Sequence, residues 1–107
     1  MIDPTQAKLL SLSAETKYAE QGIVSRTLLR TNNSRVVLFG FDEAQELSEH
    51  TSTQHALVQV LEGTCDFTVS GTTHQMKSGD VLYMPPSAAH ACVATSRFSM
   101  LLTLFKP

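Results

Sequence analysis

The chain has 107 residues, of which 42% are hydrophobic and 17% charged, and its formal net charge is -2. This length and balance fit one globular domain that needs no disulfide crosslinks to hold its core. The mild negative charge, with no cluster of Lys and Arg, argues against nucleic acid or a membrane surface as a partner.

The N-terminal residues lack the basic start and apolar run of a secretory signal, and no stretch is long and apolar enough to span a membrane. We therefore expect a cytoplasmic protein. Cys65 and Cys92 are too few for a disulfide framework, so both are expected to be reduced thiols, more often buried than reactive. Residues 1–22 are expected to form an N-terminal arm or short strand ahead of a barrel at residues 23–107.

From Ile23 onward the hydrophobic pattern has a period of two, which is typical of β-strands. Gly and Asn residues separate the apolar runs and predict tight turns between them. Eight strands are expected, with residues 46–50 as a candidate ninth: 23–30, 35–41, 56–62, 65–69, 72–77, 81–84, 88–95 and 98–105. Short, evenly spaced strands without a long amphipathic helix predict an all-β, antiparallel double-stranded β-helix, or jelly-roll barrel.

Two stretches combine turn residues with a histidine: His50 precedes the strand that Gly63 ends, and Gly79 precedes Pro85 and His90. Their spacings resemble the two motifs of the cupin family, G(X)5HXH(X)3-4E(X)6G and G(X)5PXG(X)2H(X)3N. The resemblance implies a small single-domain cupin of the RmlC-like kind, a group that includes many uncharacterised bacterial proteins. It also implies that His50 and His90 lie at the mouth of the barrel.

The chain departs from these motifs at several functional positions. Ser52 stands where the first motif has its second His, and Ala56 stands where it has Glu, so two of the four usual metal ligands are replaced. Ala44, Ser87 and Ala94 replace two Gly and one Asn. The resemblance therefore implies a divalent transition metal of unspecified identity, held by His50 and His90, with a third ligand still to be found.

His55 is the first candidate for this third ligand, since it precedes the position of the motif Glu, although strict alternation from Ala56 points it away from the barrel. Gln54 and Cys92 are weaker candidates, and Cys92 is also a candidate redox-sensing thiol if its pKa is depressed. The expected pocket has small side chains at its mouth over an apolar floor. Its expected residues are Ser52, Ala56, Tyr83, Cys92 and Met100.

Two functions remain open. The first is a histidine-lined cupin pocket that binds a divalent metal and a small molecule. The second is a metal-free module that binds a small molecule or is purely structural, without catalysis. Whether the protein is an enzyme is left open, because fold alone does not choose a reaction. Strands that are apolar on both faces predict a homodimer, since one small barrel cannot bury both faces.

Overall fold

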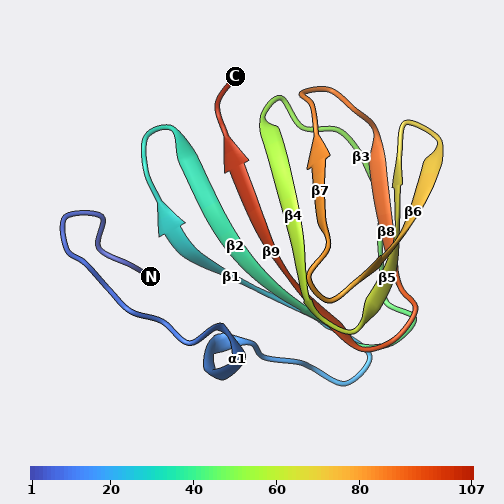
Figure 1. Cartoon of the computed structure of the whole chain (residues 1–107), viewed down its shortest axis with the longest axis horizontal. Coiled ribbons are helices and arrows are strands. Elements are labelled where there is room, and N and C mark those ends of the chain that lie inside the picture. Colours follow the sequence, from blue (N-terminus) through green and yellow to red (C-terminus); the bar gives the residue numbers. More distant parts are fainter.

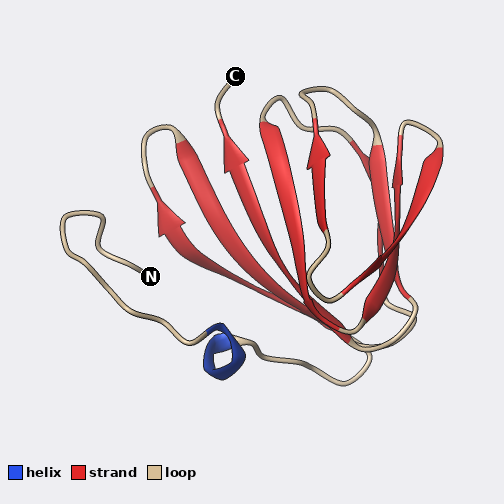
Figure 2. Ribbon diagram, in the orientation of Figure 1, coloured by secondary structure: helices blue, strands red, loops and turns tan.

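The computed structural model describes all of residues 1–107. The chain folds into nine strands and one short helix, and residues 46–50 form a strand (Figures 1 and 2). The elements are α1 (Leu12–Glu15), β1 (Ile23–Arg30), β2 (Ser34–Phe41), β3 (Glu46–His50), β4 (His55–Glu62), β5 (Thr64–Val69), β6 (Thr72–Lys77), β7 (Val81–Met84), β8 (His90–Ala94) and β9 (Phe98–Phe105). The predicted all-β class is confirmed.

The strands form two antiparallel sheets that face each other. One has five strands in the order β1-β2-β9-β4-β7, and the other has four in the order β3-β8-β5-β6. Figure 1 shows the sheets converging where β2 ends and β9 begins, here called the closed end, and splaying apart at the opposite, open end. The open end lies where β4 begins and β9 ends. This arrangement confirms the jelly-roll fold, although the two sheets do not close into a continuous barrel.

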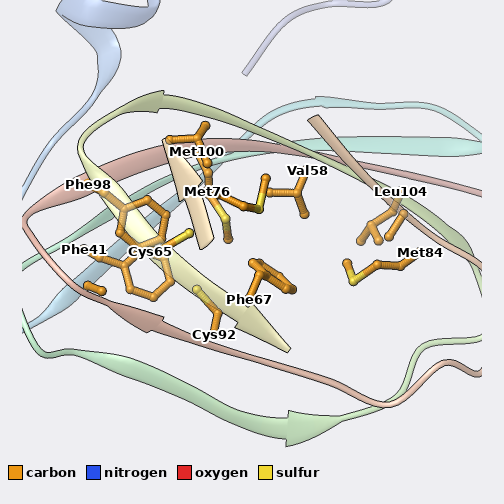
Figure 3. Close-up of a cluster of buried hydrophobic side chains, with 13 residues drawn as sticks. Phe41, Val58, Cys65, Phe67, Met76, Met84, Cys92, Phe98, Met100 and Leu104 are labelled. Atoms are coloured by element: carbon orange, nitrogen blue, oxygen red, sulfur yellow. The ribbon is translucent and has the colours of Figure 1, made fainter. Parts of the chain in front are cut away.

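Alternating side chains of both sheets fill the space between them. Thirteen buried residues form one cluster, ten of which are labelled in Figure 3. Near the closed end Phe41 of β2 stacks on Phe98 of β9, with ring centroids 4.5 Å apart. Stacked aromatic pairs of this kind add about 1 kcal/mol beyond the area that they bury. Side chains therefore fill the space between the sheets at the closed end, and any cavity for a ligand lies toward the open end.

Residues 1–22 run along the outside of the five-stranded sheet rather than forming a tenth strand. Ser11 caps α1 by accepting a hydrogen bond from the Ala14 amide. The segment crosses β2 closely at Gly40, where an added Cβ would lie 2.1 Å from the Lys17 carbonyl oxygen. An ion pair between Arg26 and Glu15, 2.7 Å apart, ties it to β1. The only helix is four residues long, and no helix is long and apolar enough to cross a membrane.

Candidate functional site

A cavity of about 350 Å³ lies between the two sheets near the open end. Thirteen side chains line it, of which eight are hydrophobic. The polar members are Arg35, His50, Ser52, Gln54 and His90, and the apolar members are Phe39, Leu47, Ala56, Phe67, Met84, Met100, Leu102 and Leu104. Apolar walls with a few polar groups are typical of sites for small molecules.

His50 and His90 lie side by side at this cavity. They are direct partners in the pairing of β3 with β8, and their ring centroids are 4.2 Å apart with the planes tilted by 60°. The Pro85-Pro86 corner ends β7 and turns the chain, so that β8 begins at His90. The His90 side chain is buried, at 8% exposure, whereas His50 is open to solvent. The two motif histidines therefore contribute one deep and one accessible imidazole.

Each imidazole is oriented by a main-chain carbonyl two residues earlier in the sequence. His50 Nδ1 lies 2.8 Å from the Ser48 carbonyl oxygen, and His90 Nδ1 lies 3.0 Å from the Ala88 carbonyl oxygen. Because a carbonyl only accepts hydrogen bonds, Nδ1 carries the proton and donates in both rings. In the neutral ring Nε2 then holds a free lone pair, and neither Nε2 has a hydrogen-bonding partner in the chain.

A β-bulge in β3 explains how His50 reaches the cavity. Leu47 and His50 are three residues apart, so strict alternation would place them on opposite faces of the sheet. The pairing with β8 shifts register between these two residues, and both line the cavity. Ser48, which alternation from His50 would point inward, instead lines a separate hollow beside Glu46 and Glu49. The bulge thus turns one imidazole inward at the end of the strand.

His55 does not lie with the other two histidines. It occupies the outer face of β4, where Nδ1 is 2.6 Å from the Tyr83 hydroxyl and the ring stacks on Phe105 at a centroid distance of 4.9 Å. Its neighbour Ala56 faces the cavity instead. The outward alternation of β4 therefore prevails, and the three-histidine set considered from the sequence is not assembled. Tyr83, expected in the pocket, also lies on the outer face, at 49% exposure.

Cys92 points inward but lies in the packed core, outside the residues that line the cavity. The thiol of Cys65 beside it and burial both raise the pKa of Cys92. A raised pKa is the opposite of what a redox-sensing thiol requires, because the thiolate is the reactive form. The structure therefore argues against the redox role, and Cys92 forms part of the wall of the core.

Of the other predicted pocket residues, Ser52, Ala56 and Met100 line the cavity. Sequence reasoning missed Arg35, which stands at the start of β2 on the same face as Phe39. The available signal was the two-residue period of β2, because Arg35, Phe39 and Phe41 share one parity. Gln54, considered only as a weak third ligand, also lines the cavity from the loop before β4.

The donor set decides how well this cavity fits a transition metal. Two imidazoles with free Nε2 atoms suit several divalent metals, and carbonyl bonds to Nδ1 are the usual support for such ligands. However, no group of three His, Cys, Asp or Glu side chains is placed to hold a metal, and such sites generally use at least three protein ligands. The residues therefore fit a metal only as a two-histidine site completed by outside donors.

The comparisons with known proteins agree with this fold. A family model described as a cupin domain matches residues 37–105. A conserved protein of unknown function from Streptococcus pyogenes has a similar structure, with 32% identity, 95% of this chain and 90% of that chain covered, and a TM-score of 0.87. No curated protein matches the chain by sequence.

Two further solved structures are similar along most of this chain. A cupin superfamily protein from Desulfitobacterium hafniense has 24% identity and a TM-score of 0.87, with 95% of this chain and 94% of that chain covered. A cupin 2 conserved barrel domain protein from Leptotrichia buccalis has 32% identity and a TM-score of 0.86, with 91% of this chain and 47% of that chain covered. With its jelly-roll fold and the family model matching most of its length, the chain belongs to the cupin family.

Proposed function

We propose that this cupin binds a small molecule in the cavity between its sheets, with His50 and His90 as polar contact points. The observation that carries the proposal is the pair of hydrogen bonds that fix both Nδ1 atoms and leave both Nε2 atoms free. A free Nε2 in a largely apolar cavity accepts a hydrogen bond from a ligand hydroxyl or amide. A cytoplasmic location and a homodimeric state belong to the same proposal.

A divalent transition metal is the second candidate occupant. The carbonyl bonds at both Nδ1 atoms favour it, because they hold an imidazole in the form that binds metals. His50 and His90 would hold the ion, which would supply Lewis-acid chemistry when bound. Water or the small molecule itself would have to provide the remaining ligands, so we expect weaker binding than at a site with three protein ligands.

The methionines of this chain offer a direct test of ligand binding. The chain has four, of which Met84 and Met100 line the cavity, Met76 lies in the packed core and Met1 is exposed. In a fragment screen on protein labelled with ¹³C at the methionine methyls, true ligands should shift the Met84 and Met100 signals and leave the Met1 signal in place. A screen in which no fragment shifts the two cavity methyls would overturn the proposal.

The histidines can be tested with a matched control. His50→Ala should weaken the affinity for fragments that carry a hydrogen-bond donor by roughly fivefold, since a hydrogen bond contributes about 1 kcal/mol. His74→Ala should change nothing, because His74 is exposed on β6 outside the cavity. Metal analysis of the purified protein, before and after incubation with Mn, Fe, Co, Ni, Cu or Zn, tests the second candidate. Absence of bound metal in every case would exclude it.

A further inference from the structure

Arg35 gives the cavity a positive charge that nothing in the chain neutralises. Its side chain is half-buried and lines the cavity at the open end, where it pairs in register with Leu104 of β9. The three ion pairs of the structure are Arg26 with Glu15, Lys77 with Asp80, and Arg97 with Asp42. Arg35 takes part in none of them, and its guanidinium makes no hydrogen bond, so all five of its N–H donors are available to a ligand.

No acidic side chain lines the cavity. A guanidinium that is partly withdrawn from water gains from an anion beside it, because the attraction between charges is stronger in the lower dielectric of a cavity. The same charge opposes a free divalent cation. The amide of Gln54 lines the same region, makes no side-chain hydrogen bond and can donate to the same anion.

A hollow beside the cavity carries the same sign of charge. A polar hollow of about 290 Å³ adjoins the cavity and shares Arg35 and Gln54 with it. Arg30 and Lys106 also line this hollow, and no Asp or Glu does. Three cationic side chains thus line a hollow beside the cavity, in a protein whose net charge is -2. Such local concentrations of one charge attract oppositely charged ligands and speed their association.

We propose that the cavity binds a small, largely apolar carboxylate whose charged group pairs with Arg35. This inference rests on the proposed function that the cavity is a ligand site, and it adds the class of ligand. The planar guanidinium matches the two oxygens of a carboxylate in a bidentate pair. The apolar walls, with Phe39, Phe67 and Leu102 among them, favour an apolar body. A phosphate monoester carries nearly two charges, whereas Arg35 is the only Arg or Lys that lines the cavity itself.

The experiment compares acids with their neutral amides on the unmodified chain. The probes are benzoate, 3-phenylpropionate and hexanoate, with benzamide, 3-phenylpropionamide and hexanamide as partners of the same shape. Affinities are measured at pH 7 in 50 mM salt by titration of the Met84 and Met100 methyl signals. Each acid should bind at least roughly tenfold more tightly than its amide, and the difference should shrink in 500 mM salt.

Variants then assign the preference to one residue. Arg35→Gln should remove the difference in affinity between each acid and its amide. Arg35→Lys should retain part of this difference, since lysine keeps the positive charge but cannot form the bidentate pair of a guanidinium. Arg97→Gln is the matched control, because this arginine pairs with Asp42 at the closed end. It should leave the acid preference unchanged.

The outcomes separate this inference from the proposed function. Equal binding of acids and amides, unaffected by Arg35→Gln, would overturn the carboxylate assignment and leave a ligand-binding cavity. Tighter binding of phenyl phosphate than of any acid would also overturn it, in favour of a phosphorylated ligand. If no probe of either series shifts the two methyl signals at millimolar concentration, the proposed function fails together with the inference.

Discussion

Ala44 and Ser87 adopt a backbone conformation that favours glycine, at the two positions where the cupin motifs have glycine. Their φ angles are 68° and 70°, in the left-handed region. A residue with a Cβ loses about 1–2 kcal/mol in this region, because the Cβ crowds the following carbonyl oxygen. Replacing either residue with glycine removes this strain. Glycine also gives the unfolded chain more conformational freedom, and this lowers the stability of the folded state by about 0.4–1 kcal/mol.

The two substitutions remove little else. Both side chains are exposed, and neither takes part in a side-chain hydrogen bond. The main-chain bonds from Ala44 N–H to the Ala94 carbonyl, at 2.9 Å, and from Ser87 N–H to the Ser52 carbonyl, at 2.7 Å, remain available to glycine. We therefore expect each of Ala44→Gly and Ser87→Gly to stabilise the protein by about 0.5–1 kcal/mol.

Urea unfolding followed by circular dichroism measures this gain as a rise in the midpoint at constant slope. The two sites lie in loops at opposite ends of the strands, so the double variant should gain the sum, about 1–2 kcal/mol. Ala19→Gly is the matched control: this alanine is exposed in a loop but has no left-handed φ, so glycine there should destabilise. If both motif variants lose stability as the control does, strain at Ala44 and Ser87 is not the reason for the motif glycines.

Three further outcomes follow from the packing. Gly63→Ala should destabilise the protein by about 3 kcal/mol or more in urea unfolding, because the Cβ of the alanine would lie 2.1 Å from the Arg97 carbonyl oxygen. An unchanged unfolding midpoint would contradict this close approach. Cys65 and Cys92 should resist a thiol reagent such as DTNB at pH 8 in the native protein and react after denaturation, because burial keeps the reagent from both thiols. Rapid reaction of either thiol in the native protein would refute this. The outer face of the five-stranded sheet exposes Leu57, Val81, Tyr83 and Phe105, and we expect the dimer to form through this face. Val81→Lys should therefore convert the dimer to a monomer, as measured by sedimentation at micromolar concentration. Thr73→Lys, on the other sheet, should leave the dimer intact. A wild-type monomer would remove the homodimer from the proposal.

Most strands were predictable because they are short runs with a hydrophobic period of two between strong turn residues, although β3 and β6 contain few apolar side chains. The observed bounds differ from the expected ones by one or two residues, as at β8, which begins at His90 rather than at residue 88. Alternation does not predict a β-bulge, after which the inward-facing positions of a strand shift by one residue. The bulge in β3 depends on pairing with β8, far along the chain, so the position of Ser48 outside the cavity could not be inferred from its own neighbours.

The site was predictable only in part, because a ligand set is a matter of geometry among distant strands. His50 and His90 lie together, as the motif spacing implied, but the hydrogen bond of His55 to Tyr83 on the outer face leaves them without a third imidazole. Ser52 and Ala56, which stand where the family motif has His and Glu, line the cavity with small side chains. The cavity therefore lacks two of the family's metal ligands at these positions, and one of the two, the Glu, would have carried a negative charge. With no carboxylate in the lining, the guanidinium of Arg35 sets the charge of the cavity, which is why we expect this cupin to select an anion more readily than a cation.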